Sequence, residues 1–136
     1  MLEFTFIYGE NGYAVSRDLR EHIFGAQASD DKESVSYHIV GYDKTEQIAV
    51  GRFFAQSETV CRLDFIGVRE DYRRQYVGDL VIKAIEDKAK MLGIKTAVLE
   101  TPNSALPFFE FEGYEKEGAL KMRKDLTKPH KCRGCV

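Results

Sequence analysis

Apolar and polar positions in the first quarter of the chain predict one strand followed by one helix. Residues 2–8 combine β-branched and aromatic side chains, a composition typical of strands. Between residues 13 and 24, apolar side chains recur every fourth position and form one face of a predicted helix. Residues 26–34 are small or polar and predict a loop.

The next part of the chain predicts three strands joined by short turns. The strand-like runs cover residues 35–42, 47–56 and 59–68. Because short turns join antiparallel neighbours, we expect two hairpins. Cys61 alternates with Leu63 and Phe65 along the third run, which indicates a core position rather than a reactive thiol.

The remaining pattern predicts two helices that alternate with two strands. An amphipathic helix is expected over 77–92, a strand over 94–100, a short helix over 105–112 and a last strand over 114–126. The predicted order is β-α-β-β-β-α-β-α-β. A helical crossover between the strands at 59–68 and 94–100 implies a parallel pair, so the fold class is mixed α/β.

Composition and charge restrict the kind of protein. A chain of 136 residues that is 43% hydrophobic indicates one folded domain, which we place at 1–126. The formal net charge of −2 argues against a nucleic-acid partner, which calls for a strong basic excess. No apolar run approaches the ~18–20 residues that span a membrane. Since no basic leader is visible, we expect a cytoplasmic protein with reduced cysteines.

The segment 127–136 forms a basic, cysteine-containing tail. His130, Cys132 and Cys135 bring together side chains that bind zinc, and the C-x-x-C spacing also suits a redox pair. The alternative is an exposed chain end with two free thiols, because termini are usually poorly ordered. We predict no metal site, and the tail alone would support a metal-binding or nucleic-acid-binding protein.

The most informative stretch lies between residues 66 and 80. A predicted strand runs into a basic, polar loop and then directly into a helix. A helix start offers free N–H groups and the positive end of the helix dipole, which together attract anions. Arg73 and Arg74 add cationic donors suited to phosphate, and Gly78 leaves room for a ligand. The alternative is a solvated loop that caps a surface helix.

This stretch resembles the acetyl-CoA signature of the GNAT superfamily of N-acyltransferases. It reads V68-REDY-R73-R-Q-Y76-V-G78-DL, and residues 103–114 resemble the family's N-x-A…F-Y-x-x-x-G-F helix. The predicted element order matches the family fold from about residue 3 to residue 126. The resemblance implies a mostly antiparallel sheet with a central parallel pair and helices on both faces.

The resemblance also implies a site for acetyl-CoA as cosubstrate. The end of the strand at 66–68 would bind the pantetheine amides, the amides of 74–79 would hold the pyrophosphate, and the helix after Asn103 would flank the thiol. The implied acetyl-CoA-binding residues are Ile66, Gly67, Val68, Arg73, Arg74, Gln75, Tyr76, Val77, Gly78, Asp79, Asn103 and Phe109.

Two residues depart from the family pattern. Tyr76 replaces the first signature glycine, and its Cβ resists a positive φ, although its amide donates as well as a glycine amide. Phe109 stands where many members have a tyrosine that protonates the leaving thiolate. Water would then protonate the thiolate. The rate lost would be only part of the ~10²–10⁴-fold gain that is typical of acid–base catalysis.

Three residues are candidates for the base that accepts the proton of the amine. Asp64 lies where many members place a glutamate, but an ion pair with Arg62 explains it equally well. Glu100 ends the next strand, where it also suits a helix start. His38 is alone on a strand, and such a histidine is more often structural than catalytic.

The resemblance implies an N-acetyltransferase in which an amine attacks the thioester directly. The acceptor would be a small molecule or a peptide, recognised by the early loops, the tail or a second subunit of a homodimer. Tyr76 and Phe109 also suit an alternative, a non-catalytic acyl-CoA-binding module or sensor of the same fold.

Overall fold

The computed structural model describes residues 2–128, whose backbone forms a seven-stranded sheet with three α-helices. The strands are β1 (Leu2–Tyr8), β2 (Tyr37–Asp43), β3 (Glu46–Ala55), β4 (Val60–Val68), β5 (Thr96–Glu100), β6 (Glu115–Lys116) and β7 (Lys121–Asp125). The helices are α1 (Glu10–Phe24), α2 (Val77–Met91) and α3 (Leu106–Phe111). Short 3₁₀ turns cover Glu33–Val35, Glu70–Tyr72 and Asn103–Ala105.

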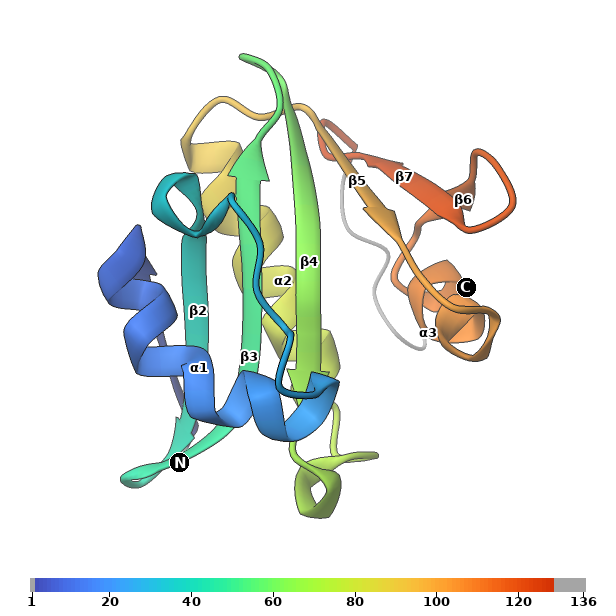
Figure 1. The fold of residues 1–136 in the computed structure, drawn as a ribbon. Coiled ribbons are helices and arrows are strands. Elements are labelled where there is room, and N and C mark those ends of the chain that lie inside the picture. The colour runs from blue at the N-terminus through green and yellow to red at the C-terminus, as the bar shows by residue number, and fades with distance from the viewer. Residues whose placement is uncertain (1, 129–136) are drawn as a thin grey trace.

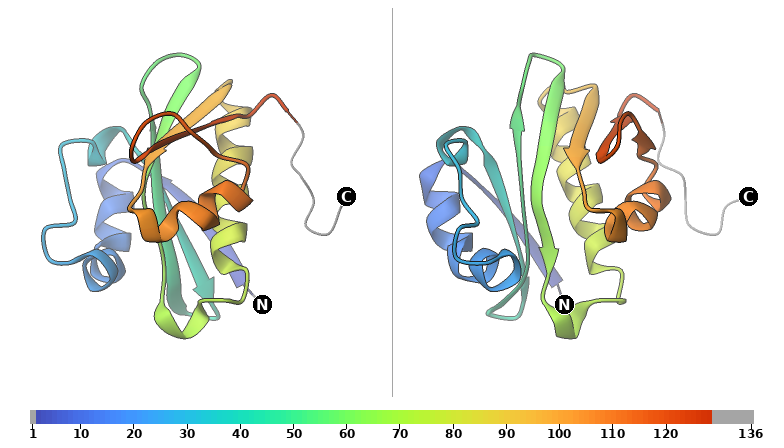
Figure 2. Two further views of the ribbon diagram at one scale, coloured as in Figure 1. Left: turned by 90° about the vertical axis from the view of Figure 1, so that its right-hand side faces the viewer. Right: turned by 45° about the vertical axis from the view of Figure 1, so that its right-hand side comes forward.

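The strand order in the sheet is β1-β2-β3-β4-β5-β7-β6 (Figure 1). Neighbouring strands are antiparallel except β4 and β5, which pair in parallel through the α2 crossover. Helix α1 covers one face of β2 to β4 and α2 covers the other (Figures 1 and 2). The mixed α/β class, the mostly antiparallel sheet and the parallel pair are confirmed.

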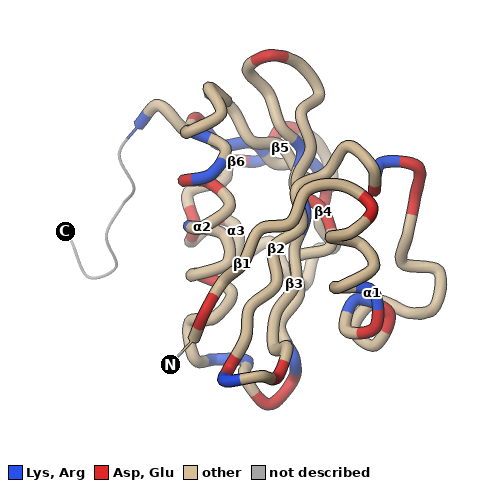
Figure 3. Tube along the Cα trace, turned by 90° about the vertical axis from the view of Figure 1, so that its left-hand side faces the viewer, with Lys and Arg blue, Asp and Glu red and all other residues tan. Residues whose placement is uncertain are grey.

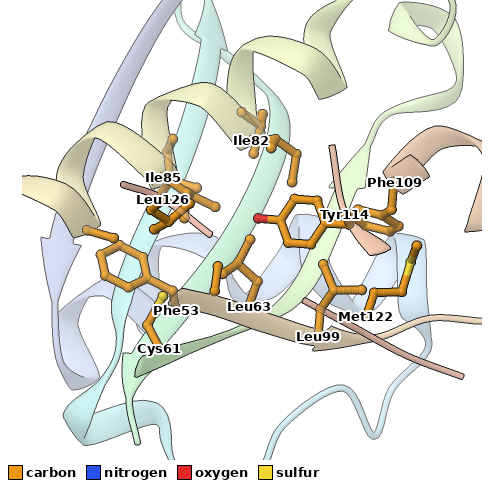
Figure 4. Close-up of a cluster of buried hydrophobic side chains, with 14 of the residues drawn as sticks. Phe53, Cys61, Leu63, Ile82, Ile85, Leu99, Phe109, Tyr114, Met122 and Leu126 are labelled. Atoms are coloured by element: carbon orange, nitrogen blue, oxygen red, sulfur yellow. The ribbon is translucent and has the colours of Figure 1, made fainter. Parts of the chain in front are cut away.

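The main core lies between α2 and the sheet (Figure 4). Apolar residues of α2 repeat at helical spacing and meet side chains of β3, β4 and β5. The fully buried members from α2 are Val81, Ile82, Ile85 and Ala89. Cys61 is fully buried in this core, as predicted, and burial raises the pKa of its thiol to about 12. Its thiol is therefore unreactive near neutral pH.

A buried charged pair joins α2 to the last hairpin. Both carboxylate oxygens of Glu86 accept hydrogen bonds at 2.9 Å, one from the Tyr114 hydroxyl and one from Lys124 Nζ. Lys124 also donates to the carbonyl of Glu112 at 2.7 Å. These contacts hold α3 and β7 against α2. They therefore stabilise the relative positions of the elements that surround the site described below.

Two boundaries differ from the sequence-based expectation. Residues 114–126 form a hairpin, β6 and β7, instead of one strand, because the chain turns at 117–120, where the Glu117 N–H donates to the Lys121 carbonyl at 2.8 Å. Helix α1 begins at Glu10 instead of residue 13, since the N–H groups of Gly12 and Tyr13 donate to the Gly9 carbonyl. Within residues 2–128, no helix is long and apolar enough to cross a membrane.

We predict that Gly12→Ala destabilises the protein although alanine is the better helix former. A methyl group at Gly12 would lie 2.3 Å from the Ile7 carbonyl oxygen and 2.6 Å from His38 Cδ2. We expect a loss of about 3 kcal/mol in the free energy of unfolding, at the upper end for overpacking. Urea unfolding measures it, with the exposed neighbour Asn11→Ala as control. Equal stability of the two variants would contradict the close contact.

Candidate functional site

The parallel pair of strands separates before β4 ends. Pairing runs from Val60 opposite Thr96 to Leu63 opposite Leu99, whereas β4 continues to Val68. Figure 1 shows the two strands diverging toward their C-terminal ends. Among the described residues, no strand pairs with this edge of β4 after Leu63. Apart from the Val68 carbonyl, which accepts from Arg73, its backbone groups can therefore pair with a ligand that lies along the edge as a further strand would.

A β-bulge lies in the separated part of β4. Arg52 is opposite Asp64, but Val50 is opposite Gly67, so β4 contains one more residue than β3 between these pairs. Phe65 has a φ of +53°, in the left-handed region that costs a residue with a Cβ about 1–2 kcal/mol. The Phe65 ring contacts Phe24 of α1 at 5.6 Å between centroids. Phe65 therefore lies on the α1 face of the sheet.

The bulge reverses the alternation of β4. Cys61 and Leu63 face the α2 core, but Phe65 does not continue with them, contrary to a regular alternating strand. Ile66 and Val68 take up the α2 side instead and pack at the margin of the core. A visible signal exists in the sequence, since the apolar positions change from odd to even numbers between Phe65 and Ile66.

A cavity of about 880 Å³ opens where β4 and β5 separate. The ends of α1 and β4, the start of α2 and the turn before α3 surround it. Its lining residues are Ile23, Phe24, Ile66, Gly67, Val68, Arg73, Arg74, Tyr76, Val77, Gly78, Asp79, Ser104, Ala105 and Phe108. Nine of the twelve residues predicted from the sequence lie among them, and Gln75, Asn103 and Phe109 do not.

One end of the cavity has the geometry of an anion site. The first i→i−4 bond of α2 runs from the Leu80 N–H to the Tyr76 carbonyl at 3.1 Å. The N–H groups of Val77 and Gly78 come before this bond and therefore have no acceptor within the helix. Such groups lie at the positive end of the helix dipole. Arg73 and Arg74 line the same end, which gives it two positive charges suited to phosphate.

The loop before α2 is held in a strained conformation. Arg74 and Tyr76 have φ values of +64° and +62°. Tyr76 therefore adopts the positive φ of the signature glycine although its Cβ disfavours that conformation, and the residue is 64% exposed. Alternating left-handed residues turn successive N–H groups toward one side of the loop, as in anion-binding nests. Arg73 Nε donates to the Val68 carbonyl at 3.0 Å and ties the loop to β4.

The base of this loop is attached to the β2–β3 hairpin. The N–H of Arg69 donates to the Ile48 carbonyl at 2.8 Å, and its guanidinium pairs with Asp71 at 2.7 Å and with Glu46 at 3.2 Å. The Tyr72 hydroxyl donates to Asp43. These contacts limit the movement of the arginine-bearing segment that follows.

Helix α3 presents Phe108, not Phe109, to the cavity. Phe109 is 8% exposed and packs edge-on against Tyr114 in the core. Phe108 lies beside the start of α2, where a methyl group added to Gly78 would be 3.2 Å from its ring. Consecutive residues of a helix point about 100° apart, so only one of the two rings can face the cavity. The packing of α3 decides which ring faces the cavity, and the sequence pattern does not show that packing.

A network of buried charges lies on the α1 face behind the bulge. Arg52 is fully buried and donates to Asp30 at 2.6 and 2.7 Å, to Glu33 at 3.0 Å and to Asp64 at 2.9 Å. Arg20 of α1 is also buried and donates to the other oxygen of Glu33 at 2.6 Å. Figure 3 shows acidic and basic positions close together along the segment that follows α1. The carboxylates compensate the buried guanidinium groups.

Asp64 has both oxygens engaged. Arg62 Nε donates to Oδ1 at 2.9 Å, the ion pair that the sequence offered as the alternative to a catalytic base, and Arg52 Nη2 donates to Oδ2. Glu100 is half-exposed and lies 3.7 Å from Arg62. His38 is fully buried and contributes to structure, since its ring is bonded to Arg20 and to the Glu33 carbonyl.

A second, smaller groove of about 570 Å³ reaches β4 from the α1 side. Asp30, Asp31, Lys32, Val35, Phe54, Ala55, Gln56, Arg62 and Asp64 line it. Two of its acids, Asp30 and Asp64, are paired with arginine, so their charge is compensated within the protein. In the described part of the chain, no group of three potential metal ligands occurs. His130, Cys132 and Cys135 lie outside the described residues.

Comparison with known proteins assigns a family to this arrangement. A family model described as the acetyltransferase (GNAT) family matches residues 3–114. An uncharacterized N-acetyltransferase of Bacillus subtilis, YjcF, is 32% identical over 85 residues. That match covers 62% of this chain and spans 60% of the length of the relative.

Solved structures share the fold. An acyl-CoA N-acyltransferase from Pseudomonas aeruginosa superposes with a TM-score of 0.81 at 14% identity, over 91% of this chain and 99% of that chain. A GNAT family acetyltransferase from Elizabethkingia anophelis, solved with acetyl-CoA bound, gives a TM-score of 0.75 at 15% identity, over 90% and 97%. At such low identities, these likenesses concern the fold alone.

We predict that His38 makes stability depend on pH between about 6.5 and the lower pKa that it has in the folded protein. Burial lowers that pKa below 6.5, and the positive charge of Arg20 lowers it further. Arg20 donates to Nδ1, so the single proton of the neutral ring lies on Nε2. The unfolded chain binds a proton near pH 6.5 and the folded chain does not. The contribution of His38 to the free energy of unfolding is therefore fully present above about pH 6.5. Below that pH the free energy of unfolding falls by up to about 1.4 kcal/mol per pH unit.

Urea unfolding at pH 8, 6.5 and 5.5 measures this slope. His38→Gln should flatten it, whereas His22→Gln, at an exposed position of α1, should preserve it. Asp30 does not interfere, because the hydrogen bond from Arg52 lowers its pKa from 3.8 to about 2, and its contribution is lost only as the pH falls through that range. A slope that persists in His38→Gln would contradict the assignment.

Proposed function

The chain belongs to the acetyltransferase (GNAT) family, and from that premise we propose that it transfers the acetyl group of acetyl-CoA to an amine. The observation that carries the proposal is the meeting of nine sequence-predicted residues in one cavity where β4 and β5 separate. A strand edge without a partner and a helix start flanked by two arginines fit the two parts of coenzyme A, its amide-containing arm and its phosphates.

The proposed placement of acetyl-CoA follows the chemistry of the lining. Its pyrophosphate would lie at the N-terminus of α2 near Arg73 and Arg74, and the amides of its arm would bond the edge of β4 at Ile66–Val68. Ile23, Phe24 and Phe108 supply apolar walls, which exclude water from the thioester. Gln75, Asn103 and Phe109, which do not line the cavity, remain predicted contacts.

The transfer would be a direct attack. The nitrogen lone pair of a neutral amine attacks the thioester carbonyl and forms the C–N bond, the C–S bond breaks, and coenzyme A leaves as a thiolate. The amine nitrogen gives up one proton to water, and the thiolate takes up one proton, so that the products are the amide and the free thiol. Backbone N–H groups along the separated edge of β4 would polarise the carbonyl. Water would protonate the thiolate, since Phe109 has no proton to give and is buried in the core.

The acceptor would enter through the smaller groove. Arg62 and Asp64 of β4 line that groove just before the strands separate, so it approaches the same strand segment from the α1 face. Its remaining walls come from 30–35 and the end of β3. A small-molecule or peptide amine fits this volume. We also propose a cytoplasmic location and a homodimer as a further source of acceptor contacts.

A non-catalytic acyl-CoA-binding module is the second candidate. Phe109 in place of a tyrosine and the doubly paired Asp64 favour it, because neither side chain is set up to transfer a proton. Release of free thiol from acetyl-CoA across a library of amines separates the two functions, since a module binds acetyl-CoA without releasing coenzyme A. Phe109→Tyr in the same assay tests whether the missing hydroxyl limits the rate.

We predict that the protein binds acetyl-CoA with micromolar affinity and that Gly78→Glu abolishes binding. The new side chain would fill space beside Phe108 and place a negative charge at the proposed phosphate site. We expect at least about a 100-fold loss, as for like charges brought together. Titration calorimetry measures it. Gly118→Glu adds the same charge at the 117–120 turn, where a Cβ meets nothing closer than 3.9 Å, and should bind normally. Absence of binding by the wild type would refute the proposal.

We predict that Asp64→Asn lowers stability more than catalysis. The substitution removes a charge that compensates Arg52 and Arg62, so the free energy of unfolding should fall by about 1–3 kcal/mol. The turnover number should change by only a few-fold, with an unchanged dissociation constant for acetyl-CoA. A loss of about 10²-fold or more in kcat, together with loss of the acidic limb of the pH–rate profile, would instead identify Asp64 as the base.

A further inference from the structure

We infer that Arg20 and Arg52 are positioning residues for the cofactor cavity: they hold the ring of Phe65, and with it the bulge that directs Ile66 and Val68 into the cavity. None of Arg20, Arg52 and Phe65 lines the cavity, so their action is indirect. The inference rests on the proposed function only where acetyl-CoA binding is used to measure it.

The ring of Phe65 lies within cation–π distance of two cations. The Arg20 guanidinium carbon is 4.5 Å from the ring centroid and that of Arg52 is 4.9 Å away. Both arginines are almost completely buried, so water competes little for their charge and the attraction to the ring is strong. An aromatic side chain at residue 65 is therefore favoured on the α1 face, although its backbone must adopt a positive φ to reach it.

The two guanidinium groups cannot easily turn away from the ring. Glu33 is buried between them and accepts from Arg20 through one oxygen and from Arg52 through the other. Asp30 binds Arg52 through both of its oxygens. The Nε atoms of both arginines are buried without a hydrogen-bond partner. The side chains are thus held where the carboxylates and the ring require them, even at the loss of two further hydrogen bonds.

The conformation of residue 65 decides which side chains enter the cavity. In a regular strand, residues two apart share a face, so Ile66 and Val68 would lie on the face of Asp64. The extra residue moves both to the α2 side, where Val68 Cγ2 lies 3.8 Å from the position of a Cβ on Gly78. Opposite the bulge, Gly51 leaves the space for Ile66, since a Cβ there would be 3.0 Å from Ile66 Cδ1.

The orientation of Gly67 depends on the same register. It faces α1, where a Cβ would lie 2.9 Å from the Phe24 ring and 3.0 Å from Ile23. Both of these α1 side chains line the cavity. A shift of one residue would bring a larger side chain against α1 and displace that wall. The bulge therefore sets three sides of the cavity at once: β4, the end of α1 and the contact with α2.

Variants of Phe65 test the inference without leaving a buried charge unpaired. Phe65→Leu keeps an apolar side chain but removes the ring that both cations contact, and we expect the dissociation constant for acetyl-CoA to rise at least about tenfold, as for a misplaced positioning group. Phe65→Tyr keeps the ring and should stay near the wild-type value. Phe6→Leu is the matched control, because that ring also lies 5.9 Å from a cation, Lys88, but Phe6 is on β1 and lines neither the cavity nor the smaller groove.

Calorimetry is run at a temperature where every variant is folded, so that a merely less stable protein would still bind normally. Amide hydrogen exchange at Gly67 and Val68 is recorded without ligand. Faster exchange at these two positions in Phe65→Leu, and not in Phe6→Leu, supports the inference independently of acetyl-CoA. Wild-type binding and exchange in Phe65→Leu would overturn it. If the wild type itself does not bind acetyl-CoA, the proposed function fails, and the exchange result alone decides the inference.

Discussion

The structure depends on one buried guanidinium, that of Arg52. A fully buried cation is tolerated only when carboxylates surround it, and here Asp30, Glu33 and Asp64 do so. Two of these acids come from the connection after α1 and the third from β4, so satisfying the charge fixes that connection against the sheet. Removing one partner of a fully buried pair, such as Arg52 and Glu33, costs about 3–5 kcal/mol, whereas apolar replacement of a whole network is often neutral. The network is therefore better explained by what it specifies than by stability.

What the network specifies is the shape of the cavity. The bulge, the early end of the β4–β5 pairing and the left-handed residues before α2 are each unfavourable when taken alone, and all border the same cavity. A left-handed residue with a Cβ costs about 1–2 kcal/mol. The regular core between α2 and the sheet compensates for these costs, and the Glu86 contacts hold the far wall. Strain is thus concentrated where a ligand would bind.

The sequence was sufficient for the element order up to residue 113, for the parallel pair and for most of the cavity lining, the last because residues 66–80 resemble the acetyl-CoA signature of the family. It was insufficient for the bulge, for the choice of Phe108 over Phe109 and for the β6–β7 hairpin. These features depend on tertiary contacts: the arginines around Phe65, the packing of Phe109 on Tyr114, and the turn closed between Glu117 and Lys121. The left-handed Tyr76 likewise overrides a local preference.

The positions of titratable groups indicate how such a site would accelerate transfer. In the lining of the larger cavity, they are Arg73, Arg74, Tyr76 and Asp79, all in the loop and the first turn of α2. The walls formed by β4, α1 and α3 are apolar side chains, backbone and the hydroxyl of Ser104. Holding two reactants in the reactive geometry lowers the activation barrier by about 7–11 kcal/mol. This is a larger effect on the rate than the ~10²–10⁴-fold gain that an acid or base supplies. A site with this lining therefore relies on accurate placement of the thioester, and the register of β4 that Phe65 sets becomes its most sensitive feature.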